Sequence, residues 1–272
     1  TQAVAADKPT IELGYVQTWP SSVGTTQLAA TVIENELGYP VKMTTADPGL
    51  LYQGVKTGDL DAQLSAWLPS THESYYEKAW ADSITLGPNL IGTRAGLVVP
   101  EYVDIDKVSE LADHADKFKS RIVGIGAGAG VMEDAREVID KYNLDFELQA
   151  SSTAGMAAAL RRATQNDEWV VVTGWSPLWI WGKFDLKYLE DDRGIYEEAG
   201  YVSTLTSREL PGKAPEVFQF LRRFQISIQT LNNLTLAMEE GKSEQEAVND
   251  WLDENTATVN QWVAGIDRAG GN

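Results

Sequence analysis

The sequence predicts an α/β fold with two lobes, each a mainly parallel sheet flanked by helices. Strand-like and helix-like segments alternate between residues 11 and 80, and a second alternating series runs from residue 95 to 173. From Pro215 onward the chain reads as helical. A length of 272 residues is long for a single core and suits two domains. We expect the C-terminal helices to return to the first lobe.

The first series contains three apolar strand segments and three helical ones. Gly38 and Gly58 follow two of the helices, where a glycine commonly ends a helix. The expected strands are residues 11–16, 41–45 and 60–66, and the expected helices are 27–37, 47–56 and 70–80.

The second series and the C-terminal region complete the prediction. Ser243 with Glu246 forms a capping box at the start of one late helix. The expected strands are 95–99, 121–125, 146–149, 170–173 and 201–206, and the expected helices are 108–118, 131–142, 153–163, 216–223, 228–239 and 243–255, with a final piece to 266. Lobe I is therefore predicted to be 10–99 plus 203–272 and lobe II 100–202, after a flexible segment 1–9.

Composition excludes several classes of function. The formal net charge of −18 opposes binding to nucleic acid or to anionic lipid. With no cysteine and two histidines, neither a disulfide nor a zinc site is expected. No apolar run approaches the ~20 residues of a membrane span. Residues 1–9 are small and polar and lack the apolar core of a signal peptide, which is typical of the start of a mature secreted protein and equally of an ordinary disordered terminus.

Three tryptophans follow strand-like runs. Trp19, Trp67 and Trp175 each stand at the end of such a run, with a proline one or two residues later. In open α/β sheets, ligands bind beyond the carboxyl ends of the strands. We therefore expect the three indoles to converge on one crevice, with packing in the core as the alternative.

Several aromatic faces around one volume suit a quaternary ammonium group. Indole faces attract cations, with up to ~2 kcal/mol per desolvated contact. A quaternary ammonium has no N–H donor to satisfy, so no carboxylate partner is needed. A sugar also stacks on tryptophan, but sugar sites need several Asp, Asn and Arg side chains nearby, and these loops contain few.

The segment from Pro20 to Thr26 predicts a place for an anion. It opens a helix directly after Trp19, so free backbone N–H groups and the positive end of the helix dipole face the crevice. No acidic residue lies in this segment, whereas the hydroxyl of choline would need an acceptor. A cation cage beside an anion site favours a zwitterion such as a betaine.

Two further motifs were weighed. Gly124-x-Gly126-x-x-Ala129 loosely matches a dinucleotide-binding loop, although a tight helix start is the plainer interpretation. His72, shortly after Trp67, is a candidate for the pocket edge or for a surface position. An enzyme, either dinucleotide-dependent or glycan-active, is the alternative class of function, but no nucleophile stands near a base in the sequence.

Over nearly its whole length the chain resembles the glycine betaine-type substrate-binding proteins of ABC importers. The resemblance rests on residues 11–16, on Gly58-Asp59-Leu60-Asp61 running on to Ala66-Trp67-Leu68-Pro69-Ser70-Thr71-His72, and on residues 96–100, 124–130, 172–177 and 185–189. It implies a type II periplasmic-binding fold that closes on a ligand between two lobes.

The resemblance also implies site residues and partners. Trp67 and Trp175 match members of the family's tryptophan box, and Ser21, Ser22 and Val23 match its carboxylate-binding segment. Residues 224–227 lack a tryptophan that some members carry, so Trp19 is our candidate for the third wall.

We expect a monomer outside the cytoplasm that needs no cofactor or metal and delivers a small zwitterionic or cationic ligand to a membrane permease. Glycine betaine is the first choice of ligand. Choline, carnitine, proline betaine and a sulfonium analogue such as dimethylsulfoniopropionate remain alternatives. The same fold serving as the ligand-binding lobe of a sensor also stays open.

Overall fold

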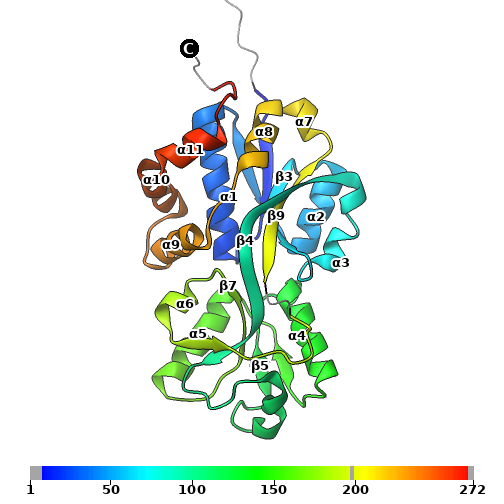
Figure 1. Ribbon diagram of the computed structural model, residues 1–272, viewed down its shortest axis with the longest axis vertical. Coiled ribbons are helices and arrows are strands. Elements are labelled where there is room, and N and C mark those ends of the chain that lie inside the picture. Colours follow the sequence, from blue (N-terminus) through cyan, green and yellow to red (C-terminus); the bar gives the residue numbers. More distant parts are fainter. Residues whose placement is uncertain (1–7, 197–198, 269–272) are drawn as a thin grey trace, which may run out of the picture.

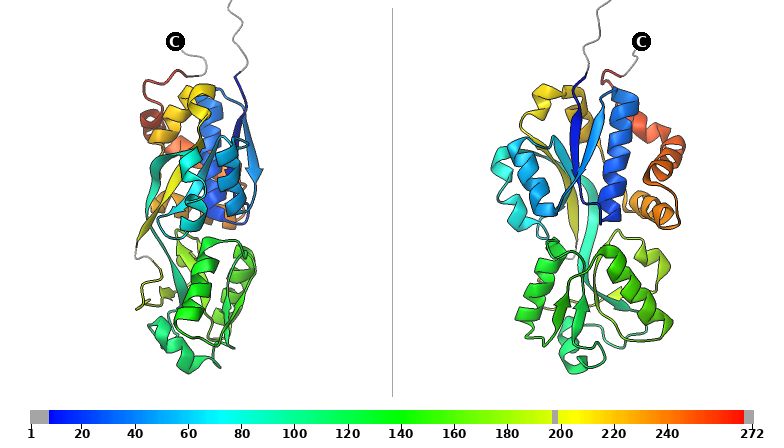
Figure 2. Two further views of the ribbon diagram at one scale, coloured as in Figure 1. Left: turned by 90° about the vertical axis from the view of Figure 1, so that its right-hand side faces the viewer. Right: turned by 180° about the vertical axis from the view of Figure 1, so that it is seen from behind.

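The structure is a computed structural model that describes residues 8–196 and 199–268. Residues 1–7 of the predicted flexible segment lie outside the described residues. Two lobes are stacked along the long axis of the molecule, and the long strand β4 (Ser83–Pro100) runs from one into the other (Figure 1). In both further views the lobes are distinct and meet around this connection and at the loops that face each other (Figure 2).

The sheet of lobe I is mixed rather than mainly parallel. Strand β1 (Ile11–Tyr15) pairs in parallel with β2 (Val41–Thr45) and β3 (Ala62–Leu68). Strand β9 (Gly200–Ser207) lies between β3 and β4 and is antiparallel to both. The expectation of a mainly parallel sheet is thus wrong here, because the chain inserts β9 only after its return from lobe II.

Lobe II continues the same sheet through the end of β4. Strand β7 (Val172–Ser176) pairs antiparallel with residues 94–98 of β4, and β8 (Leu186–Tyr188) pairs with residues 98–100. Strand β5 (Arg121–Val123) is parallel to β7 and to β6 (Glu147–Gln149). The strand order is β2-β1-β3-β9-β4-β7-β5-β6.

Helices cover both lobes. Helix α1 (Pro20–Val32) begins with a proline and continues into a π-helical turn, Ile33–Leu37, which Gly38 ends in the left-handed conformation (φ 68°). The other α-helices are α2 (Pro48–Thr57), α3 (Glu73–Tyr76), α4 (Gly130–Lys141), α5 (Thr153–Gln165), α6 (Ile180–Lys183), α7 (Leu210–Lys213), α8 (Pro215–Arg223), α9 (Ile228–Glu239), α10 (Glu244–Glu254) and α11 (Thr256–Trp262). Helices α9 and α10 lie beside α1 in lobe I, and α11 contacts α10 (Figure 1).

Several boundaries differ from the prediction. The helix expected at 27–37 begins at Pro20, and the one expected at 70–80 is only α3 plus a 3₁₀ turn, Trp80–Asp82. The helix expected at 108–118 is a 3₁₀ helix, Val108–His114. The strand expected at 95–99 is the end of the 18-residue β4. Gly87 and Gly92 adopt positive φ within β4 and interrupt its register with β9, which hides the strand in the sequence pattern.

The lobes are in direct contact. The larger hydrophobic cluster extends from α1 and β1 through Trp19, Trp67 and Trp175 into lobe II, where it reaches Met132 and Met156. A second cluster fills the far end of lobe II around Phe118. The exact lobe boundaries at residues 99/100 and 202/203 stay a prediction. In the part of the chain that the structure describes, no helix has the length and apolar character needed to cross a membrane.

Asp61 provides a test of how lobe I is held together. Its side chain is 4% exposed and accepts hydrogen bonds from the backbone N–H of Glu12 (2.8 Å) and from Lys213 Nζ (2.6 Å). Asp61→Ala should lower the free energy of unfolding by about 2 kcal/mol, measured by urea denaturation, because it leaves both donors without their acceptor. Asp59→Ala, at a neighbouring exposed position, is the control. Equal effects of the two variants would contradict this assignment.

Candidate functional site

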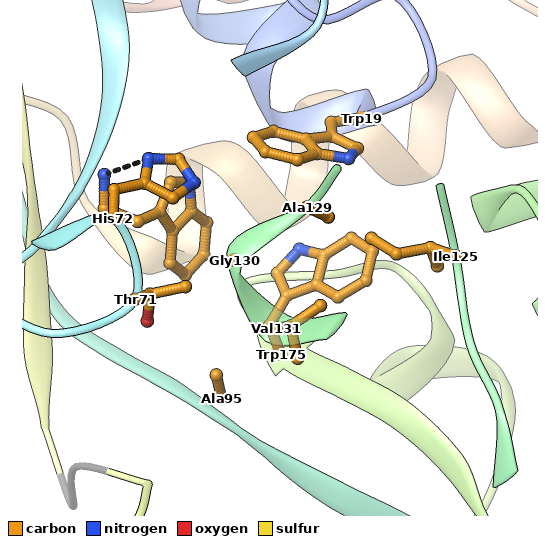
Figure 3. A pocket seen from close by; sticks show the side chains of 10 residues that line it. Trp19, Thr71, His72, Ala95, Ile125, Ala129, Gly130, Val131 and Trp175 are labelled. Carbon is orange, nitrogen blue, oxygen red and sulfur yellow. Dashed lines mark hydrogen bonds between the residues drawn. The ribbon is translucent and has the colours of Figure 1, made fainter. Parts of the chain in front are cut away.

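A cavity lies between the lobes, lined by residues from both. Trp19 and Trp175 face it from opposite lobes, with Thr71 and His72 to one side (Figure 3). Its walls are Trp19, Trp67, Thr71, His72, Ala95, Ile125, Ala129, Gly130, Val131 and Trp175.

The three predicted tryptophans meet at this cavity. Trp19 is the N-cap of α1, Trp67 lies near the end of β3, and Trp175 lies near the end of β7. Each is between 5% and 8% exposed. Trp67 and Trp175 lie within their strands, since β3 extends to Leu68 and β7 to Ser176, further than the expected strands 60–66 and 170–173. They still reach the cavity because both are near the carboxyl ends of their strands, which point toward the other lobe.

A hydrogen bond from Trp181 holds the backbone of Trp175. Its carbonyl accepts a hydrogen bond from Trp181 Nε1 at 2.7 Å, and the Trp181 ring packs on Tyr188 with 4.6 Å between ring centroids. The Ser176-Pro177 peptide bond is cis, and α6 begins only at Ile180. Trp175 therefore belongs to strand β7 and not to the start of a helix.

His72 joins two walls of the cavity. Its Nδ1 accepts a hydrogen bond from the backbone N–H of Trp67 at 3.2 Å, which fixes that nitrogen as unprotonated. The hydroxyl of Tyr52, also 3.2 Å from Nδ1, is then a second donor. The imidazole stacks on Trp19, with 5.7 Å between ring centroids and 27° between planes. His72 thus connects the backbone at Trp67 to the ring of Trp19.

Burial keeps His72 neutral. The side chain is fully enclosed, and loss of hydration lowers its pKa from 6.5 to about 3. The single proton of the neutral ring is then on Nε2, because Nδ1 is an acceptor. A neutral imidazole beside Trp19 does not repel a cation in the cavity.

Ser21, Ser22 and Val23 form the first turn of α1 and are buried, but they are not among the residues lining the cavity. The N–H of Val23 donates to the carbonyl of Trp19 at 3.0 Å, so this amide already has a partner within the helix. The amides of Ser21 and Ser22 precede it, where an α-helix leaves N–H groups unpaired. Ser22 Oγ accepts from the N–H of Val16 (3.0 Å) and from Ser65 Oγ (2.8 Å), which ties this turn to β1 and β3.

The prediction missed most of the wall in lobe II. Ile125 and Ala129 come from the segment between β5 and α4, which includes the glycine motif at Gly124, Gly126 and Ala129, and Val131 comes from the first turn of α4. Small and aliphatic residues have no chemical signature in a sequence. The signal available was the position of the segment, at the end of a strand and the start of a helix.

The chemistry of the walls is aromatic and uncharged. None of the described lining residues is an acid or a permanently charged base, and His72 is neutral. No group of acidic or histidine residues able to hold a metal occurs in the described part of the chain. The arrangement can enclose a soft cation by cation–π contact and apolar packing.

Comparison with known proteins identifies the family. The family model described as the substrate-binding domain of ABC-type glycine betaine transport systems matches residues 9–254. The chain belongs to this family. The family consists of extracytoplasmic substrate-binding components of ABC importers, so the enzyme alternatives are wrong.

Individual relatives agree with the family assignment. The glycine betaine/carnitine transport binding protein GbuC of Listeria monocytogenes is 33% identical over 162 residues, which are 58% of this chain and 54% of GbuC, so the match spans about half of that relative. The closed, glycine betaine-bound structure of lactococcal OpuAC superposes with a TM-score of 0.89 at 32% identity, covering 94% of this chain and all of that one.

A third similar protein was solved with a different ligand. The choline complex of an ABC-transporter choline-binding protein has a TM-score of 0.88 at 25% identity and covers 97% of this chain and 94% of its own. The fold of all these chains is the type II two-lobed binding protein.

The pKa of His72 leads to a prediction on pH. A group with a folded pKa near 3 and an unfolded value near 6.5 adds stability that is complete above pH 6.5 and is lost as the pH falls toward 3. His72→Asn keeps an acceptor for the N–H of Trp67 but cannot titrate. In urea unfolding between pH 6 and 4, wild type should lose up to ~1.4 kcal/mol per pH unit more than this variant. Parallel curves would show that His72 titrates normally.

Proposed function

We propose that this protein captures glycine betaine, or a closely similar zwitterion, in the cavity between its lobes. The single observation that carries the proposal is the meeting of Trp19, Trp67 and Trp175 at one uncharged cavity. Three indoles from separate segments can enclose a trimethylammonium group, each contributing up to ~2 kcal/mol when water is excluded.

The carboxylate of the ligand is assigned to the first turn of α1. Ser21 and Ser22 offer backbone N–H groups at the positive end of a 13-residue helix, directly after Trp19. The bonds from Val16 and Ser65 to Ser22 Oγ support this role because they hold the turn in place before the ligand arrives. His72 is the second candidate donor, through its protonated Nε2 at the cavity wall.

The uncharged walls favour a zwitterion over choline. A zwitterion brings its own negative charge, which the helix amides can receive. Choline would leave its positive charge balanced by the indoles alone and would need an acceptor for its hydroxyl. Carnitine, proline betaine and dimethylsulfoniopropionate share the pairing of a methylated cation with a carboxylate, and they remain alternatives within the same mode of binding.

Delivery to a permease completes the proposed role. The family works with ABC importers, and a two-lobed protein that closes on its ligand presents a different surface in its loaded state. We propose that the protein acts outside the cytoplasm, as the substrate-binding components of its family do, and that it does so as a monomer. Neither a cofactor nor a metal is part of this role.

Titration of tryptophan fluorescence tests the ligand. Glycine betaine should change the emission and bind more tightly than choline, with carnitine, proline betaine and dimethylsulfoniopropionate measured in parallel. The change is expected because the three cavity indoles contact the ligand directly. No response to any methylated ammonium or sulfonium compound would refute the proposal, and tighter binding of choline would overturn the assignment of the anion site.

Removing one wall should weaken binding by a defined amount. Trp175→Ala is expected to cost at least ~1–2 kcal/mol, which is about tenfold in affinity, measured by calorimetric titration with glycine betaine. Trp80→Ala is the matched control, because Trp80 is 58% exposed and lies outside the cavity. Unchanged affinity in Trp175→Ala would remove this residue from the cage.

A further inference from the structure

Gly130 lies where the two lobes touch. It is the first residue of α4 in lobe II, and it faces Thr71, which follows β3 in lobe I. A Cβ atom at residue 130 would stand 2.0 Å from the carbonyl oxygen of Thr71 and 2.7 Å from its Cγ2. A backbone oxygen cannot rotate away as a side chain can. The observed approach of the lobes therefore requires a residue without a side chain at this position.

Hydrogen bonds surround this contact. Tyr75 donates from its hydroxyl to the carbonyl of Gly128 at 2.7 Å, and Ser74 Oγ donates to Glu133 Oε2 at 3.2 Å. We call these residues the α3–α4 clasp: Thr71, Ser74 and Tyr75 of lobe I with Gly128, Gly130 and Glu133 of lobe II. Tyr75 also packs edge-on against His72, with 5.6 Å between ring centroids. The clasp is thus continuous with the wall of the cavity.

The opposite side of the cleft is bridged by ion pairs. Glu239 of α9 in lobe I lies 3.5 Å from Arg161 and 3.6 Å from Lys183 in lobe II. These side chains are between 29% and 46% exposed, and exposed ion pairs contribute little stability. Among the contacts between the lobes described above, the close approach of Gly130 to Thr71 is therefore the one that sterically limits closure.

We propose that Gly130 determines how far the lobes close, and through this the affinity and the size of the ligand that the cavity accepts. The ligand part of this inference rests on the proposed function. Gly130 and Thr71 are themselves cavity walls, so any side chain at residue 130 holds the walls apart. Trp175 in lobe II is then kept away from Trp19 and Trp67 in lobe I, and cation–π attraction is lost beyond about 6 Å.

Gly130→Ala is the decisive variant, and Gly128→Ala is its matched control. A Cβ at residue 128 would have no neighbour within 4 Å, and neither glycine has a positive φ. Calorimetry with glycine betaine should give at least tenfold weaker binding for Gly130→Ala and a change of less than twofold for Gly128→Ala. Thermal unfolding of both variants shows whether either is misfolded. Equal affinities in the two folded variants would overturn the proposal.

Ligand size provides a second readout. Because the alanine enlarges the closed cavity, Gly130→Ala should lose less affinity for carnitine than for glycine betaine. In small-angle X-ray scattering, saturating glycine betaine should reduce the radius of gyration of wild type and Gly128→Ala but not of Gly130→Ala. A normal reduction in Gly130→Ala would contradict the proposal.

A measurement without ligand separates this inference from the proposed function. The chain contains no cysteine, so Ser74→Cys with Glu133→Cys introduces a single thiol pair across the clasp. A short bifunctional thiol reagent should link the pair rapidly beside Gly128→Ala and much more slowly beside Gly130→Ala. Equal linking rates would overturn the role of Gly130, whatever the protein binds. Failure of wild type to bind any methylated ammonium would overturn the proposed function alone.

Discussion

A cation held by aromatic faces must be stripped of water on several sides at once, and this requirement governs the architecture of the protein. A single indole on a surface gives a weak contact, since water competes for both partners. Three indoles around one volume have to come from different segments, because neighbours along a strand or helix point in different directions. Here the N-cap of α1 and the ends of β3 and β7 supply one each. Two of these segments belong to one lobe and the third to the other, so the cage is complete only when the lobes meet.

The uncharged walls provide no acidic partner for a cation, and other features of the site have to compensate for this. Without a carboxylate in the lining, the positive charge of a ligand is balanced only by the indole quadrupoles and by the ligand's own negative charge. This explains why His72 has to be neutral and buried. Its Nδ1 accepts from the N–H of Trp67, so protonation there would break this contact as well as place a charge beside Trp19. The burial that positions His72 within the cage also lowers its pKa and so suppresses a competing cation there.

The sequence was most informative where local chemistry repeats. A tryptophan with a proline one or two residues later lies near the end of β3 and of β7 and at the helix start after β1, and all three tryptophans line the cavity. The sequence was least informative where tertiary contacts decide. The positive φ angles of Gly87 and Gly92 resemble turns, yet the surrounding strand continues because β9 pairs along its length. Trp80 has the spacing of a packed helical residue but is 58% exposed, since its helix breaks into short turns.

The strand β4 has a mechanical consequence. It is hydrogen-bonded to β9 in lobe I and to β7 and β8 in lobe II, so the connection between the lobes is part of the sheet rather than a slack tether. Register shifts near Pro88 and Ile91, with Gly92 at φ 90°, soften it at the crossing. A connection of this kind lets one lobe bend toward the other in one plane. It resists translation of the lobes past each other and rotation about the long axis. The lobes then open and close along the same path in each cycle, and the indoles return to the same relative positions.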